Sequence, residues 1–347
     1  MAFPLSVLDV TPVVTGSSVS QALQNSIDLA RFADARGFTR YWFAEHHNSP
    51  GIASTSPDIM IGQVARETRH LRVGSGGVML PNHAPLKVAE SFKVLEALYP
   101  ERIDLGIGRA PGTDMRTALA LRRSEEGLQA AENFPEALLE LQAFATGNFP
   151  ANHVFSSVMA YPKDVPLPPI WLLGSSGFSS QLAAFKGTGF SFAHHINGAG
   201  AVQAMTTYRE EFRPSAQFPN PHAILAVSVI CADTDEEAER LALSVTHAFF
   251  TLQKGISATS GMLSPAEVEA YPLSAQDRMI MRAVRERHIV GSPSTVLKQL
   301  TPLLDQTQAD ELMILSMIHD HAARRHSYDL LANLFEVAPT YQAQEQR

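Results

Sequence analysis

Consecutive acid–base residues stand at two places in this chain where an apolar run ends. Glu45, His46 and His47 follow one short aromatic run, and His195 follows another apolar run. An imidazole has an ordinary pKa near 6.5, so His46 or His195 could act as a general acid or base at neutral pH. The same residues could instead bind a divalent metal. Adjacent strand residues point to opposite faces, so His46 and His47 are not expected to ligate one ion, and no metal site is predicted.

A second group of residues has the chemistry of an anion site. Gly174, Ser175, Ser176 and Ser179 lie where an apolar run ends and a predicted helix begins. The first backbone N–H groups of a helix point at a bound anion, and hydroxyl groups add further donors, so the segment could bind a phosphate. Arg109, after another apolar run, could supply the counter-charge. The alternatives are an ordinary helix cap and a surface arginine.

Glycines form a third group, inside an apolar run. Gly74, Gly76 and Gly77 interrupt residues 71–80, which otherwise have the composition of a strand. Glycine inside a strand marks a bulge, a bend, or the close approach of a ligand to the backbone. A flat ring placed against this strand or a bend of the sheet would each explain the three glycines.

The composition limits the classes of partner. The 347 residues carry a formal net charge of −8 and show no cluster of lysine and arginine, so neither nucleic acid nor an anionic membrane is an expected partner. Cys231 is the single cysteine, which excludes a disulfide within the chain. No window resembles a secretion signal or a membrane span, so we expect a cytoplasmic protein.

Apolar runs and helical stretches alternate along the chain. Strands are predicted at residues 3–9, 40–44, 71–80, 102–107, 170–174, 190–194, 222–232 and 312–318. Helices are predicted at residues 20–36, 57–68, 85–98, 125–146, 179–186, 199–212, 235–250, 294–305 and 328–335. Strictly alternating strands and helices give parallel strands, and eight such units can close on themselves. The predicted fold class is therefore α/β, a (β/α)8 TIM barrel.

Two insertions interrupt this rhythm. Residues 147–169 follow the fourth strand and its helix, with a possible short strand at 158–161, and residues 252–291 follow the seventh strand and its helix. No linker divides the chain, so residues 1–347 are predicted to be one domain, with a flexible tail at 336–347.

Three motifs in order resemble one family. Residues 40–47 (RYWFAEHH), 71–81 (LRVGSGGVMLP) and 102–109 (RIDLGIGR) are similar to the second, third and fourth strand segments of the luciferase-like monooxygenases. The resemblance extends from the first strand through the sixth. Residues 83–112 are more similar to short uncharacterised members than to the light-emitting subunits.

The resemblance implies a site for reduced FMN. It makes His46 a catalytic residue beside the flavin, places His195 near the same pocket, and implies a non-prolyl cis peptide between Gly76 and Gly77. The phosphate would bind at Arg109, Gly174, Ser175, Ser176 and Ser179. Gly108 stands where the light-emitting enzymes have a reactive cysteine, so bioluminescence is not implied.

The implied activity is monooxygenation of a small organic substrate by reduced FMN and O2. A separate flavin reductase would supply the reduced flavin, and the family suggests a homodimer. Three alternatives remain open at this point: a deazaflavin-dependent dehydrogenase of the same superfamily, a flavin-binding protein without turnover, and a metal-dependent barrel hydrolase that uses Glu45, His46, His47 and His195.

Overall fold

Eight parallel strands form a closed barrel in the computed structural model, which describes residues 2–122, 133–256 and 261–340. The barrel strands are β1 (Leu5–Asp9), β2 (Arg40–Phe43), β3 (Arg72–Ser75), β5 (Ile103–Gly108), β6 (Ile170–Gly174), β7 (Gly189–Ala193), β8 (Ala223–Cys231) and β10 (Glu311–Leu315). They pair in the order β10-β1-β2-β3-β5-β6-β7-β8, and β8 pairs with β10 to close the ring. Two short strands extend it: β4 (Val78–Met79) beside β5, and β9 (Ile289–Gly291) beside the end of β8. The predicted fold class is confirmed.

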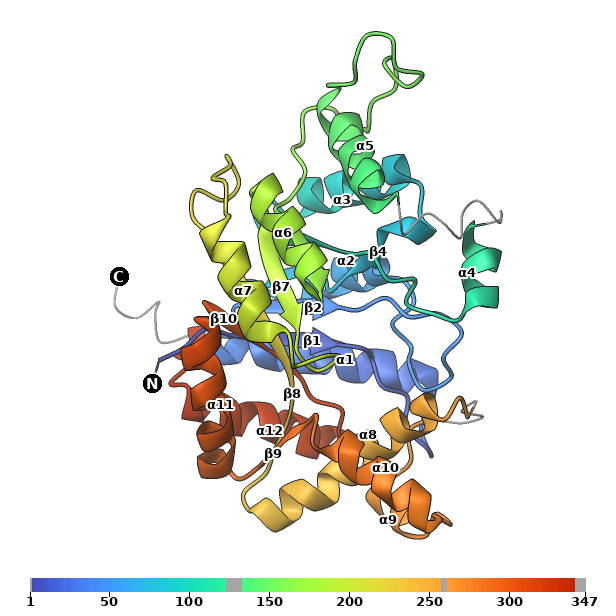
Figure 1. Ribbon diagram of the computed structural model, residues 1–347, viewed down its shortest axis with the longest axis vertical. Helices are drawn as coiled ribbons and strands as arrows, with labels where there is room; N and C mark the ends of the chain where they lie inside the picture. Colours follow the sequence, from blue (N-terminus) through green and yellow to red (C-terminus); the bar gives the residue numbers. More distant parts are fainter. Residues whose placement is uncertain (1, 123–132, 257–260, 341–347) are drawn as a thin grey trace.

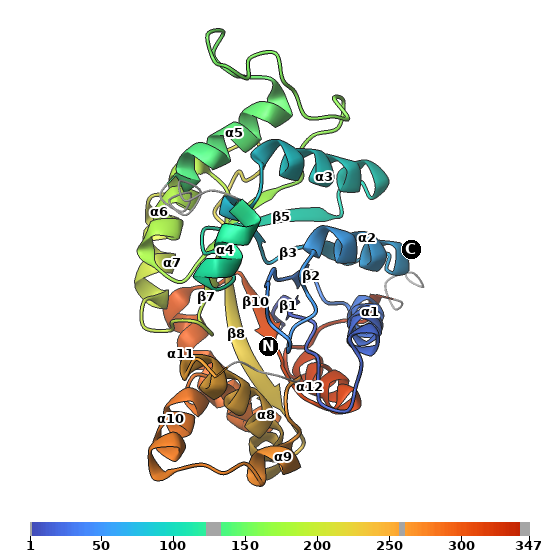
Figure 2. The same cartoon turned by 90° about the vertical axis from the view of Figure 1, so that its right-hand side faces the viewer.

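Helices surround the barrel. They are α1 (Val19–Arg36), α2 (Pro57–Glu67), α3 (Pro85–Leu98), α4 (Met115–Arg122), α5 (Phe134–Thr146), α6 (Gly177–Lys186), α7 (Ala201–Glu210), α8 (Asp235–Gln253), α9 (Pro265–Glu269), α10 (Ala275–Arg285), α11 (Pro293–Thr307) and α12 (His321–Leu334), with a 3-10 turn η1 (Leu80–Asn82). The two insertions lie at opposite ends of the long axis, with the segment after α5 at one end and α9 and α10 at the other (Figures 1 and 2).

The single strand predicted at 71–80 is wrong, because two strands replace it. Gly74 pairs with Asp104 and Val78 pairs with Ile107, so this chain segment has one more residue than β5 between the two pairs. An extra residue forms a bulge and interrupts the ladder. The interruption falls at Gly76 and Gly77, which have no side chains.

The chain after β5 differs from the prediction in four further ways. The expected helix 125–146 begins in a segment outside the described residues, and its described part is α5, where Pro135 lies in the first turn and causes no kink. Helix α4 was not predicted, nor were α9, α10 and β9 in the second insertion. The short strand expected at 158–161 is wrong: the backbone there folds onto the end of α5, with the Ala160 N–H donating to the Phe144 carbonyl.

The predicted flexible tail is described only in part. Residues 341–347 lie outside the described residues. Before them, Arg36 of α1 donates to the Val337 carbonyl over 3.0 Å, and the Thr340 hydroxyl donates to the Asp34 carbonyl over 3.0 Å.

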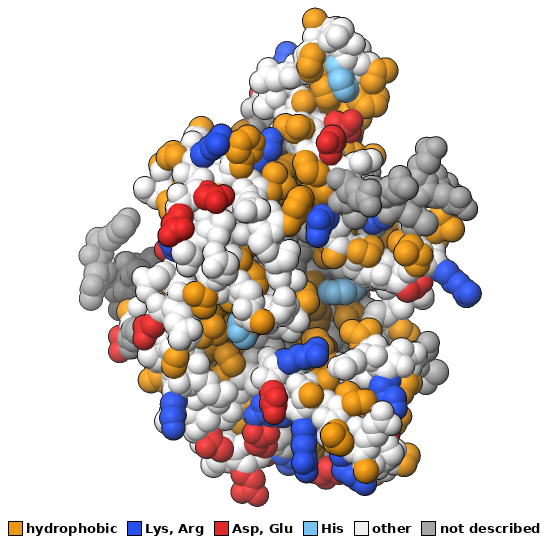
Figure 3. All heavy atoms as spheres, in the orientation of Figure 1, with side chains coloured by type: hydrophobic (Ala, Val, Ile, Leu, Met, Phe, Trp, Pro, Cys, Tyr) orange, Lys and Arg blue, Asp and Glu red, His pale blue; other side chains and the backbone are white. Residues whose placement is uncertain are grey.

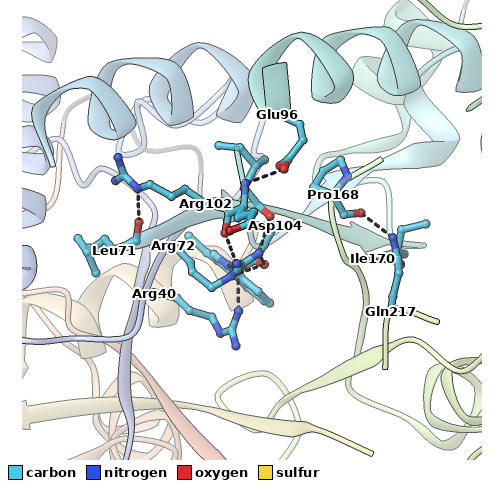
Figure 4. Close-up of polar contacts among 12 residues, drawn as sticks. Arg40, Leu71, Arg72, Glu96, Arg102, Asp104, Pro168, Ile170 and Gln217 are labelled. Carbon is cyan, nitrogen blue, oxygen red and sulfur yellow. Dashed lines mark hydrogen bonds and ion pairs between the residues drawn. The ribbon is translucent and has the colours of Figure 1, made fainter. Parts of the chain in front are cut away.

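A cluster of buried ions fills one end of the barrel interior. Arg40 of β2 binds Asp104 of β5 at 2.8 Å, and Arg72 of β3 binds the other oxygen of Asp104 (Figure 4). Arg40 also binds Glu311 of β10 at 3.0 Å. The side chains of Asp104 and Glu311 are fully buried, and the Arg40 guanidinium lies over the Trp171 ring. Burial opposes the charge of Asp104, but Arg40 and Arg72 outweigh it and lower its pKa. The cluster therefore ties four strands together across the interior.

We predict that Arg40→Met destabilises the protein by about 3–5 kcal/mol, because it leaves Asp104 and Glu311 buried without their shared partner. Urea denaturation gives the free energy of unfolding. The matched control is Arg31→Met, which breaks an exposed pair with Glu67 and should cost less than about 1 kcal/mol. Equal losses in the two variants would show that the buried cluster is not a main source of stability.

Candidate functional site

Loops at the carboxyl ends of the strands carry the predicted site residues. In (β/α)8 barrels these loops form the active site. Glu45 to His47 follow β2, Arg109 follows β5, Ser175 and Ser176 follow β6, and His195 follows β7. On the face shown in Figure 3, histidine side chains lie beside a groove. The fold therefore brings the predicted candidates to one rim.

A hydrogen bond holds the backbone of His46, whereas its ring makes none to the described residues. Its N–H donates to the Ser54 carbonyl over 3.0 Å, and the Ser54 hydroxyl donates to the Ala44 carbonyl. Its Nδ1 atom is buried and has no hydrogen-bond partner among the described residues. Burial lowers the pKa of His46, an effect that the negative charge of Glu45 partly opposes. A buried ring nitrogen without a partner is what a site for a bound molecule provides.

The two histidines of the motif have different surroundings, as predicted for adjacent residues. The Nε2 atom of His47 lies 2.7 Å from Oε1 of Glu45, away from the unpaired nitrogen of His46. Glu45 also accepts from His83 at 2.8 Å and from the Met79 N–H at 2.9 Å. Sequence reasoning missed His83, because its distance along the chain gives no indication of the contact.

His195 is oriented by β8. Its backbone N–H and its Nδ1 atom both approach the Ala226 carbonyl, at 3.3 and 3.1 Å. A carbonyl only accepts, so Nδ1 carries the proton and Nε2 keeps a lone pair. Burial lowers the pKa of His195 to about 4, with smaller contributions from His194 and His46. The ring is therefore a neutral acceptor at neutral pH, and it is close enough to His46 for a charge on His46 to lower its pKa.

His288, which precedes β9 in the second insertion, also belongs to this end of the barrel and was not predicted. Its Nδ1 atom lies 2.8 Å from the Ser228 hydroxyl of β8, two residues beyond the Ala226 position that holds His195. Its Nε2 atom is buried without a partner among the described residues. Burial lowers the pKa of His288 to about 4. No local sequence pattern distinguishes it from other residues of the insertion.

The segment after β6 leaves the start of α6 open. Ser176 occupies the N-cap position without a side-chain hydrogen bond to the helix, so side chains do not satisfy the first N–H groups. The Arg109 guanidinium lies 4.4 Å from the Phe178 ring, over the first turn. A Cβ on Gly174 would lie 2.3 Å from Oγ of the buried Ser179, so glycine permits this close packing. An exposed arginine beside an uncapped helix start can bind an anion.

Gly76 and Gly77 are joined by a cis peptide bond, the geometry that the resemblance implies. A Cβ on Gly76 would meet Leu8 at 2.7 Å, and one on Gly77 would meet Leu173 at 2.2 Å. Close packing against neighbouring side chains therefore explains why both positions are glycine.

The described residues contain no group of three histidine, cysteine, aspartate or glutamate side chains placed to hold a metal ion. In the same part of the chain, no helix combines the length and the apolar character that a membrane crossing requires. Cys231 is buried, and burial raises the pKa of its thiol to about 12.

A parallel eight-stranded barrel with titratable side chains at its carboxyl-end rim is the architecture of the (β/α)8-barrel enzymes. The sequence pattern of the luciferase-like monooxygenases matches residues 3–310. The chain belongs to the luciferase-like monooxygenase family, as its motifs predicted.

Relatives in that family match nearly the whole chain. A luciferase-like monooxygenase of Escherichia coli is 42% identical, with 95% of this chain and 96% of the relative covered. The N-acetyl-S-alkylcysteine monooxygenase of Bacillus subtilis is 34% identical, with 95% and 97% covered. The crystal structure of apo-MsnO8 is 38% identical and has a TM-score of 0.87, with 97% and 99% covered.

More distant structures share the fold. One is the oxygenating constituent of 3,6-diketocamphane monooxygenase of Pseudomonas putida in complex with FMN, at 18% identity, a TM-score of 0.68, and 97% and 100% coverage. Another is an F420-dependent secondary alcohol dehydrogenase, at 12% identity, a TM-score of 0.68, and 97% and 99% coverage.

We predict that His288→Gln makes stability less dependent on pH. The unfolded chain binds a proton at His288 below its ordinary pKa of 6.5, whereas the folded chain resists this until about pH 4. Lowering the pH in this window therefore lowers the free energy of unfolding, by about 1.4 kcal/mol per pH unit for each such group.

The measurement is urea denaturation at several values between about pH 5 and 6.5, where this linkage acts. The slope should decrease in His288→Gln and stay unchanged in His70→Gln, which removes an exposed side chain. An unchanged slope in His288→Gln would contradict the prediction.

Proposed function

We propose that this protein is a flavin-dependent monooxygenase that uses reduced FMN and O2 to oxidise a small organic substrate. The observation that carries the proposal is the buried, unpaired Nδ1 atom of His46 at the same barrel rim as an uncapped helix start with an arginine over it. A ring with a phosphate tail would use both features. Family membership supports the monooxygenase class.

The residues present fit such a cofactor. The phosphate would bind the N–H groups at the start of α6, with Arg109 and the hydroxyls of Ser175, Ser176 and Ser179 around it. Asn197 connects this region to the loop of His195, because its amide donates to the Ser175 carbonyl over 3.2 Å. The FMN complex with the same fold supports FMN as the flavin.

Bound reduced FMN would supply the electrons and the site at which O2 reacts. His46 would donate or accept a proton through its free ring nitrogen, and His195 would accept a hydrogen bond through Nε2. Val10 and Met317 belong to the apolar cluster of this interior and the partly buried Phe249 packs against it, and apolar walls exclude water. An imidazole that is neutral at rest can take up a proton and release it again, so it carries a buried charge only during the transfer.

A separate reductase would supply the reduced flavin. The fold relative that binds FMN is described as an oxygenating constituent, which supports a two-component arrangement. The described residues show a barrel and its insertions without a second domain-sized sheet on which a reductase could be built.

Spectroscopy of the purified protein tests the proposal. FMN is added, reduced without oxygen and then exposed to air, and consumption of O2 is followed with candidate substrates. We expect FMN to bind and an oxygenated product to form. A protein that ignores FMN but binds a deazaflavin and transfers hydride, as the F420-dependent relative in fold suggests, would overturn the proposal. Flavin binding without turnover would do the same.

We predict that His46→Ala lowers monooxygenation by on the order of 100-fold or more and leaves FMN binding nearly intact, because the variant loses acid–base chemistry and little binding surface. Turnover and the dissociation constant of FMN are measured separately. His70→Ala, an exposed histidine just before β3, is the control and should behave as the unchanged protein. Equal losses of binding and turnover in His46→Ala would contradict the assigned role.

We predict that Arg109→Ala weakens binding of FMN but not of riboflavin, which lacks the phosphate. Loss of one charge-assisted hydrogen bond costs about 1.5–3 kcal/mol, or on the order of 10- to 100-fold in affinity. Arg116→Ala removes an exposed arginine of α4 and controls for net charge. Arg109 does not hold the phosphate if the two ligands weaken alike.

A further inference from the structure

The Glu45 carboxylate is bound from three segments of the chain. Its Oε1 atom lies 2.7 Å from Nε2 of His47 and 2.8 Å from Nε2 of His83, and its Oε2 atom accepts the Met79 N–H of β4 over 2.9 Å. The side chain is only 1% exposed. A buried carboxylate is stable only with such partners, and apolar residues commonly fill such a space at no cost in stability. Packing alone therefore does not explain a glutamate here.

Hydrogen bonds hold the residues that precede and follow His46 in the chain. Glu45 and His47 are bound to each other, and the His47 N–H donates to the Gly112 carbonyl after β5 over 3.3 Å. The His46 N–H is held by Ser54. The backbone on each side of the unpaired imidazole is thus fixed to β4, to the loop after β5 and to the segment after η1.

We infer that Glu45 is a positioning residue for His46: it fixes the loop that carries the imidazole and places a negative charge beside it, with His83 as the compensating cation. The inference deepens the proposed function, on which it rests for the catalytic role of His46. Glu45 itself acts through its neighbours and has no assigned contact with the cofactor.

The charges around Glu45 support this arrangement. Burial opposes a charge on Glu45, but the hydrogen bonds from His83, His47 and Met79 outweigh it and lower its pKa. Burial likewise opposes a charge on His83, but Glu45 outweighs it and raises the pKa of His83, with Asp58 of α2 adding to the effect. The adjoining cavity of about 240 Å³ is lined by Glu45, His83, Asp58 and Lys87 of α3. His83 thus becomes charged at a higher pH than His46.

Two substitutions should lower the pKa of His46. Glu45→Gln removes the negative charge and should lower the pKa of His46 by about 1, the effect of one nearby charge. His83→Leu removes the partner that contributes most to lowering the pKa of Glu45, so it weakens the negative charge beside His46 and should lower the pKa of His46 as well. If Glu45 served folding alone, neither substitution would lower the pKa of His46.

The experiment measures the pKa of His46 by NMR of histidine-labelled, flavin-free protein, with His46→Gln used to assign its signal. Glu90→Gln, a carboxylate of α3 in the neighbouring groove, is the control and should leave the pKa of His46 unchanged. In turnover, Glu45→Gln should lower kcat and leave KM for reduced FMN unchanged. The pH profile of kcat should move with the NMR pKa.

An unchanged or raised pKa of His46 in Glu45→Gln or in His83→Leu would overturn the inference. If Glu45→Gln does not fold, the fall expected in His83→Leu decides. These readouts need no cofactor, so they are separable from the proposed function: a lowered pKa of His46 in both variants of a protein that forms no oxygenated product would support the positioning of His46 and reject the monooxygenase.

Discussion

The ion pairs of Arg40 with Asp104 and Glu311 are the constraint on which this barrel depends. A barrel interior must be filled, and a charge placed there is stable only beside its partner. Arg40 lies on β2, Asp104 on β5 and Glu311 on β10, so the pairs form only when these strands have one register. With that register fixed at one end, the loops at the other end are placed relative to one another.

Polar groups at the rim fall into two kinds, satisfied and unsatisfied. Asp9, at the end of β1, accepts from the Thr11 N–H at 2.7 Å and from Arg324 of α12 at 2.8 Å, and also from the Tyr41 hydroxyl. Both carboxylate oxygens of Asp9 therefore accept hydrogen bonds within the fold, which indicates a structural role. One ring nitrogen each of His46 and His288 is buried and has no partner in the part of the chain that the structure describes, and such groups are where a bound molecule is expected.

The histidines of the rim are tuned mainly by burial. Desolvation lowers the pKa of His46, His195 and His288, whereas the hydrogen bond to Glu45 raises that of His83. The barrel mouth thus combines neutral imidazoles inside with one ion pair behind the loop of His46. The imidazoles inside the mouth are therefore uncharged, while the charge of Glu45 remains close enough to raise the pKa of His46.

The sequence by itself determined the alternation of strands and helices, the barrel, and the rim positions of His46, Arg109, Ser175 and His195, because these follow from local patterns and from the rule that strand ends meet at one rim. It also carried the family motifs. The sequence left a bulge, a bend or a ligand contact open at Gly76 and Gly77, and only the tertiary structure decided on the bulge, since it depends on the register with β5. The same holds for His83 and His288, whose partners are distant in the chain. Contacts such as Glu45 with His83 arise from folding in three dimensions, which no local pattern of residues records.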